Sequence, residues 1–168
     1  MILDNYWKCM AAQSDGNTPG SRQTNVYVKR MDGGLYPLNT YGPYTGGADR
    51  SFYNFLNGIK TCVGGSNTPV QHDDYRLGLI YTALNNYETN ISAVNDGNKL
   101  KIVILIAGVN AYPDAITISE VGVYHTFLTG PISGASIIDV MFVREILENP
   151  ITVAPNQGFF LSFEWVQM

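Results

Sequence analysis

Apolar residues fall at about every second position in three segments of the second half of the chain, residues 116–124, 137–145 and 158–167. Many of these residues are β-branched or aromatic, and a period of two is typical of strands that bury one face. Residues 139–147 also show nearly helical spacing, but their β-branched start favours a strand. The pattern predicts an all-β fold, an antiparallel β-sandwich of jelly-roll or Ig-like type, with these segments as core strands.

Two Asp-Gly pairs predict tight strand reversals, because Asp-Gly tolerates the positive φ angles that such turns need. Asp32-Gly33 lies between residues 24–30 and 35–38, and Asp96-Gly97 lies between residues 87–94 and 99–107. The last of these runs has no polar residue after Lys101, so we expect it to be a central strand.

The remaining segments carry weaker signals. Residues 1–10 fit either a strand or a short helix, and the spacing of their apolar residues leaves both open. Residues 58–63 read as a short strand before a Gly- and Pro-containing loop. Asn149-Pro150 is expected to end one strand, with another beginning at residues 151–153.

The segment 36–53 holds four of the chain's eleven tyrosines and is interrupted by prolines and a Gly-Gly pair. An irregular aromatic segment either folds over its own core or docks on a neighbouring subunit, and both readings stay open. We expect two parts, residues 1–57 with a hairpin and a Tyr/Gly-rich interaction arm, and residues 58–168 with the sandwich. The candidate interface residues are Tyr36, Tyr41, Tyr44, Phe52 and Tyr53.

Charged residues make up 14% of the chain, against about 25% in typical soluble domains. A surface of low charge that is rich in Tyr and Gly suits a subunit packed among others, because ordering aromatic contacts costs little side-chain entropy. The net charge is −4, and Lys and Arg are scattered, with Lys29-Arg30 as the one adjacent pair. Nucleic-acid binding is therefore disfavoured, since no basic stripe is present to neutralise phosphates.

The longest apolar run, residues 102–109, is much shorter than the roughly 20 residues that span a membrane. The first residues lack the features of a secretion signal, so we expect folding in a cytoplasm and no membrane partner. In that compartment Cys9 and Cys62 are expected to be reduced thiols.

No pattern of catalytic residues emerges. A glycosidase needs two carboxylates that face one cleft, and nothing gives any two of the glutamates a shared pocket; those considered are Glu88, Glu120, Glu145, Glu148 and Glu164. The adjacent side chains of residues 72–74 alternate in direction on an extended chain, so a turn or cap role for Asp73 and Asp74 is favoured over a metal site. His125 is expected at the surface or an interface. We predict no enzymatic activity, catalytic residue, cofactor or metal.

Several stretches of the last two thirds of the chain together resemble small structural proteins of tailed bacteriophages. The family pattern is a V-G-x-G-x-T-P-P-x-x-D-D-Y-x-L loop, then I-x-E-I-G-L-Y, then an R-x-x-x-x-x-P-I-x-V-x-P-G ending. The corresponding stretches are residues 63–77, 118–124 and 144–158. The chain departs from the pattern with Val123 in place of the common Leu, and with Pro155-Asn156-Gln157-Gly158 where a Pro-Gly turn is usual.

The resemblance implies a virion component without chemistry of its own, assembled in the bacterial host cytoplasm and placed on the capsid, at head fibres or along the tail. Its expected partners are other copies of itself and capsid, portal or tail components. The alternative hypothesis is a host-receptor or carbohydrate-binding module of a phage tail or fibre. A third, a glycan-degrading enzyme, needs two carboxylates at catalytic separation.

Within the matching stretches, three residues have structural expectations. Gly122 is expected to mark a strand bulge or a close approach. Glu120 and Arg144 are expected to pair across neighbouring strands, because a carboxylate on a mostly buried sheet face is costly without a partner. Edge strands such as residues 25–30 are expected to serve as joints between subunits.

Overall fold

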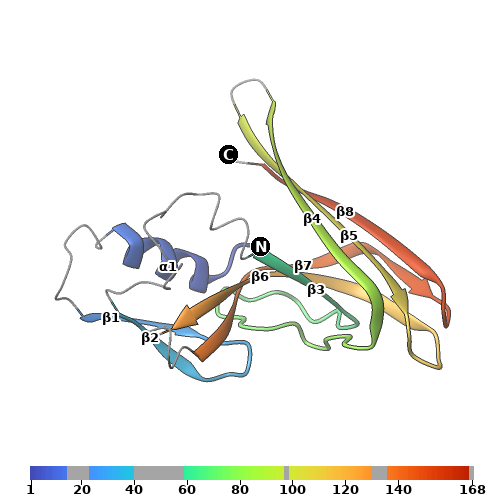
Figure 1. Ribbon diagram of the computed structural model, residues 1–168, viewed down its shortest axis with the longest axis horizontal. Coiled ribbons are helices and arrows are strands. Elements are labelled where there is room, and N and C mark those ends of the chain that lie inside the picture. Colours follow the sequence, from blue (N-terminus) through green and yellow to red (C-terminus); the bar gives the residue numbers. More distant parts are fainter. Residues whose placement is uncertain (15–22, 40–58, 97–98, 130–135, 167–168) are drawn as a thin grey trace.

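A computed structural model of the chain describes residues 1–14, 23–39, 59–96, 99–129 and 136–166. Within these ranges the chain forms one helix and eight strands (Figure 1). They are α1 (Asp4–Ser14), β1 (Gln23–Lys29), β2 (Leu35–Asn39), β3 (Ile59–Gly64), β4 (Leu84–Asp96), β5 (Lys99–Asn110), β6 (Ile116–Thr129), β7 (Ser136–Val153) and β8 (Gly158–Val166). No helix in this described part is long and apolar enough to span a membrane.

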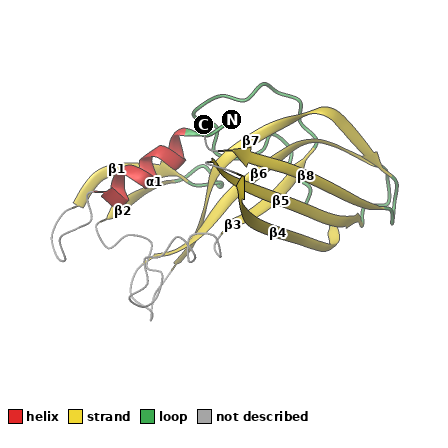
Figure 2. Ribbon diagram, turned by 90° about the horizontal axis from the view of Figure 1, so that it is seen from above, coloured by secondary structure: helices red, strands yellow, loops and turns green. Residues whose placement is uncertain are grey.

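The body of the molecule is an antiparallel β-sandwich, which confirms the predicted fold class. One sheet has the order β3-β6-β7 and the other β4-β5-β8, and β1 and β2 form a separate hairpin (Figures 1 and 2). The three alternating segments became β6, β7 and β8, and β5 is the central strand of its sheet, as its apolar run predicts. The predicted arm falls largely in residues 40–58, which lie outside the described residues.

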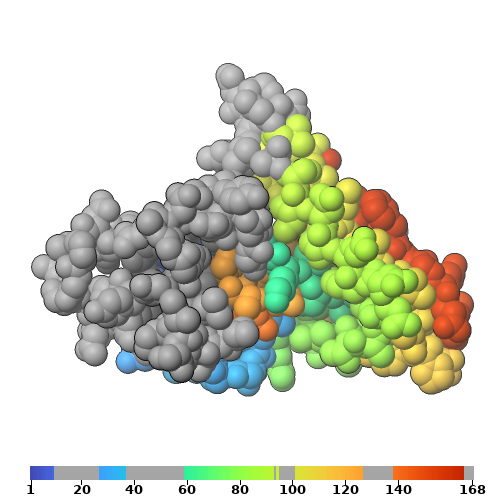
Figure 3. Space-filling model, viewed as in Figure 1, coloured from blue at the N-terminus to red at the C-terminus, as the bar shows by residue number. Residues whose placement is uncertain are grey.

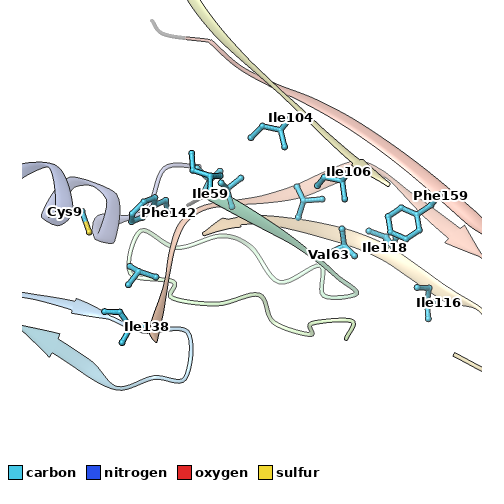
Figure 4. Packing of buried hydrophobic residues seen from close by; sticks show 14 of the residues in the cluster. Cys9, Ile59, Val63, Ile104, Ile106, Ile116, Ile118, Ile138, Phe142 and Phe159 are labelled. Atoms are coloured by element: carbon cyan, nitrogen blue, oxygen red, sulfur yellow. The ribbon is translucent and has the colours of Figure 1, made fainter. Parts of the chain in front are cut away.

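The two sheets enclose the main core. Ile104 and Ile106 of β5 and Phe159 of β8 share one buried cluster with Val63 of β3 and Ile118 of β6 (Figure 4). Burying each such side chain contributes about 1.5–3 kcal/mol, so this interface is the main stabilising contact between the layers.

The opposite face of β3-β6-β7 is also buried. Alternation along β3 places Val63 in the main core, whereas its neighbour Cys62 lies in a second cluster with Leu3, Leu77 and Met141. Residues 65–83, which connect β3 to β4 without regular structure, supply Leu77 to this cluster. The sheet β3-β6-β7, called the central sheet below, is thus covered on both faces, by the sheet β4-β5-β8 on one side and by the loop 65–83 on the other.

Of the two readings left open for residues 1–10, the helix is the one that the structure bears out, since residues before Asp4 make only one isolated bridge. Leu3 N donates to Phe142 O and Ile2 forms a bridge with Val143, which extends the β7 edge. The helix α1 then starts at Asp4. The predicted hairpin is confirmed, with Gly33 at φ 91°.

Two local predictions are wrong. Asn149-Pro150 does not end a strand, because β7 continues to Val153. The partners instead shift register, with Glu120 opposite Ile146 and Ile118 opposite Ile151, so the irregular pairing accommodates the proline.

His125 is the second error, since its exposed fraction is 3%. The strand runs four residues beyond it to Thr129, so His125 lies within β6 rather than at its end. Its ring is 6.1 Å from that of Phe142, a member of the main core.

Residues 154–157 form a tight turn in place of the Pro-Gly turn of the family pattern. Gln157 N donates to Ala154 O, which closes a four-residue turn, and Asn156 takes a φ of 61° at its third position. A type II turn needs positive φ there, and Asn is the residue that best replaces Gly in this role. The substitution therefore keeps the turn that leads into β8.

Candidate functional site

The candidate site is built around a fully buried carboxylate, that of Glu120. Glu120 of β6 is 0% exposed, and its oxygens accept three backbone N–H groups of the loop 65–83. Ser66 N and Leu79 N donate to Oε1 at 3.2 and 3.0 Å, and Gly78 N donates to Oε2 at 3.2 Å. The Glu120 side chain thus binds the loop both near its start, at Ser66, and near its end, at Gly78 and Leu79.

Arg144 of β7 completes this network and is 2% exposed. Its Nε donates to Glu120 Oε2 at 2.9 Å, and its Nη2 lies 2.8 Å from the same oxygen. The predicted contact between these two residues is therefore present. Nη1 donates to Asp74 Oδ2 at 2.7 Å and Nη2 to Thr68 O at 3.1 Å, so the guanidinium also binds the loop at two points.

The strand pairing explains how the two side chains meet. Arg144 lies opposite Gly122, two residues along β6 from Glu120, so both side chains point to the same face of the sheet. Side chains two residues apart on a regular strand share a face, but the register shift between Ile118 and Glu120 places these two on opposite faces of the sheet. Ile118 lies in the main core, and Glu120 points toward the loop. The irregularity near Pro150 therefore helps to position the network.

Glycines provide the space that the network occupies. A Cβ on Gly64 would lie against Leu79 O and 2.6 Å from Glu120 Oε1, and a Cβ on Gly78 would lie 2.5 Å from the Ser66 side chain. Gly122, expected at a close approach, would bring a Cβ to 2.7 Å from Met141 Cε and 3.0 Å from Cys62 Sγ. These glycines allow the loop to contact the sheet directly.

The partners of Arg144 favour its charged form. Burial acts to lower the pKa of Arg144, but hydrogen bonds and attraction from Asp74 and Glu120 outweigh it, so the pKa of Arg144 is raised. An arginine in this setting stays charged, and its charge offsets the cost of burying Glu120. The arrangement stabilises the fold. Both oxygens of Glu120 are occupied and shielded from water, so this carboxylate has no access to a substrate proton.

Asp74 is the network member that the sequence did not reveal. Its Oδ2 accepts a hydrogen bond from Gln71 N, which confirms the predicted turn role. The same atom binds Arg144, 70 residues away along the chain. The one available signal was the shared presence of Asp74, Glu120 and Arg144 in the motif stretches.

The predicted interface residues are only partly within the described structure. The half-buried ring of Tyr36 packs against the main core. Tyr41, Tyr44, Phe52 and Tyr53 lie outside the described residues, and their interface role stays a prediction.

Two of the glutamates considered for catalysis, Glu88 and Glu164, lie far apart on the same sheet. By register, Glu88 on β4 and Glu164 on β8 lie two strands and four residues apart. This separation is about 16 Å, at ~4.8 Å per strand and ~3.3 Å per residue, which exceeds the roughly 9.5 Å limit for a glycosidase pair. Glu164 also pairs with Lys101, and Glu145 and Glu148 are exposed on β7.

The two cysteines are free and buried, and their thiols should be protected. Burial raises the pKa of Cys9 and of Cys62 from 9.0 to about 12. The thiolate is the reactive form, so we expect no rapid reaction of the native protein with a thiol reagent at pH 8, and two reactive thiols per chain after unfolding in guanidinium. Immediate reaction without denaturant would contradict this packing.

The raised pKa of Cys62 also makes the stability of the fold depend on pH. Because the folded pKa lies above the unfolded one, the stability from the neutral Cys62 thiol is fully present below pH 9 and is lost as the pH rises toward about 12. Chemical denaturation at a series of pH values should show this loss, and a Cys62→Ala variant should show a smaller one.

Comparisons of the chain with models of protein families, with curated proteins and with solved structures find no match in any of the three.

Proposed function

We propose that the chain is a non-enzymatic structural subunit of a tailed bacteriophage virion. In this role it self-associates and decorates or connects parts of the particle, at the capsid surface, a head fibre or the tail. The proposal begins from the resemblance of three stretches of the sequence to phage structural proteins. It makes burial of surface between subunits, rather than chemistry, the basis of function.

One observation carries the proposal. The three resembling stretches, distant in sequence, meet in the buried network: Thr68 and Asp74 from the first, Glu120 from the second, and Arg144 from the third. A resemblance made of surface residues would say little about architecture. Here the shared residues hold the covering loop to the central sheet, so the resemblance extends to the parts of the sequence that specify the fold.

Exposed aromatic side chains give weaker support to the carbohydrate-binding alternative. In the described part of the chain, Trp7, Tyr27 and Phe160 are exposed, but they come from α1, β1 and β8. Sugar-binding sites use a few aromatic rings placed together with polar groups. α1 and β1 lie at one end of the molecule and the start of β8 at the other, so these three rings do not form one patch (Figure 1).

The proposal is tested by following the chain into particles. Phage particles that encode it are purified on a density gradient, and the chain is quantified by mass spectrometry against the major capsid protein. We expect the chain to sediment with the particles in many copies. A chain that stays in the soluble fraction of the lysate would refute the structural role.

A variant tests the predicted arm in the same experiment. Replacing Tyr41, Tyr44, Phe52 and Tyr53 by serine leaves Tyr36, which packs on the core, in place. We expect a folded chain, as judged by circular dichroism, that is depleted from particles, because large aromatic contacts dominate interface energies. Incorporation at the normal level would remove the arm from the proposal.

A further inference from the structure

Several strand edges in the described part of the chain are covered by other segments. Residues 1–3 bond to the outer edge of β7, and residues 79–81 bond to that of β3. On β1, the Asn5 side chain bonds both backbone groups of Lys29, so the joint expected at residues 25–30 is occupied there. Covering edges prevents them from pairing with other chains.

The edge of β8 has no such cover among the described residues. The strand pairs with β5 on one side, through nine consecutive residue pairs without a register shift. Its sequence contains no proline or lysine to discourage pairing. The opposite edge strand, β4, is interrupted by a register shift between Asn85 and Glu88, with Asn86 at a φ of 48°. Of these two edges, β8 is the regular one.

The hydrogen-bond phase identifies the free backbone groups. Asn110 N donates to Gln157 O at the start of the β5–β8 pair. Because bonded and non-bonded pairs alternate along an antiparallel ladder, the N–H and C=O groups of Phe160, Ser162 and Glu164 point away from β5. The side chains of these residues are exposed, with Phe160 at 63%. In the space-filling view, red atoms of β8 line the right-hand margin of the molecule (Figure 3).

We propose that the β8 edge pairs in antiparallel fashion with the β8 edge of a second copy of this chain, around a two-fold axis at Ser162. The two sheets then join into one six-stranded sheet. This pairing names the surface through which the chain would self-associate in the proposed function. Only the biological role of the pairing, and not the pairing itself, rests on that proposed function.

The residues of β8 favour its own copy as the partner. With the axis at Ser162, Glu164 lies opposite Phe160 of the second copy, so the two Glu164 carboxylates do not face each other. On the core-facing side, Leu161 lies opposite Phe163 of the second copy, which adds an apolar pair. An antiparallel edge of this kind is complementary to itself, as a two-fold interface requires.

A matched pair of lysine variants tests the interface. Ser162 on β8 and Asn90 on β4 both lie opposite Leu105, so they occupy one row on the exposed face, at opposite edges of the sheet. Ser162→Lys places two positive charges at the axis, and we expect at least about tenfold weaker self-association in analytical ultracentrifugation. Asn90→Lys carries the same charge change and should associate like the wild type. Circular dichroism confirms that both variants fold.

A cysteine trap gives a second readout. Residues opposite each other in an antiparallel bonded pair have Cα atoms about 5.5 Å apart, within the range of a disulfide. We expect Ser162→Cys to form a covalent dimer under mild oxidation and Asn90→Cys not to do so. The native Cys9 and Cys62 are buried and do not compete.

Three results would overturn the inference: a wild-type chain that is monomeric across the concentration series, self-association that Ser162→Lys leaves unchanged, or cross-linking through Asn90→Cys in place of Ser162→Cys. If the chain is found in particles but any of these holds, the β8 interface is wrong and the structural role in the virion stands. A chain that dimerises through β8 but never enters particles gives the reverse outcome.

Discussion

Replacement of Arg144 by leucine is expected to lower the free energy of unfolding by about 3–5 kcal/mol, the usual cost of removing one partner of a buried ion pair. The variant leaves the Glu120 carboxylate buried with three backbone N–H groups and no positive charge. It also removes the bonds to Asp74 and Thr68, so the loop loses two further attachments. Denaturant unfolding followed by circular dichroism measures the change.

Arg76→Leu is the matched control. Arg76 lies in the same loop but is exposed, and its guanidinium is near the Tyr75 ring at 5.4 Å. Exposed substitutions of this kind usually change stability by no more than about 0.5 kcal/mol. Equal effects of the two leucine variants would show that the network does not hold the loop to the sheet.

Gly64→Ala is the second substitution with a large expected effect, a destabilisation of about 3 kcal/mol, at the upper end for overpacking. The added methyl group would press on Leu79 O and on Glu120 Oε1. Leu79 O accepts a hydrogen bond from Gly65 N, so it cannot withdraw without breaking the contact between loop and strand. The φ of Gly64 is not positive, so the cost arises from this collision rather than from backbone strain.

Gly158→Ala separates the collision from the general effect of replacing glycine in a strand. The nearest atom to a Cβ on Gly158 is Gly108 O at 3.7 Å, an ordinary contact. We expect thermal unfolding of Gly158→Ala near the wild-type temperature, and that of Gly64→Ala clearly below it. If Gly64→Ala unfolds with Gly158→Ala, the close packing of loop and sheet described above is incorrect.

The regular parts of the fold could be predicted from the sequence because their signals are local. Alternation identified β6, β7 and β8, Asp32-Gly33 lies between β1 and β2, and β4 and β5 pair as a hairpin up to Asp96 and Lys99. Apolar residues on both faces identified β5 as central. Each of these conclusions needed no more than about ten neighbouring residues.

The network was only partly predictable, because its contacts join residues that are distant in sequence. The Glu120–Arg144 pair followed from the cost of a carboxylate in a core strand. Asp74 gave no comparable signal, since an acidic residue in a loop usually forms a turn, and Asp74 does that as well. The three backbone donors to Glu120 depend on the path of the irregular loop, which no periodicity encodes.

The two local errors have different causes. A register shift keeps Pro150 within β7, although proline ordinarily ends a strand. Such an irregularity depends on the partner strand, and the local sequence does not specify it. His125 lies two residues after Val123 of the main core, in a strand that continues to Thr129, so ordinary alternation buries it.

A reconstruction of the intact particle by electron cryomicroscopy tests the proposal that this chain is a repeating structural part of a phage particle. We expect density for the two-layered sandwich at symmetry-related positions on the capsid, head fibre or tail, with neighbouring copies in contact. A reconstruction in which every protein density is assigned and none fits this chain would contradict the proposal.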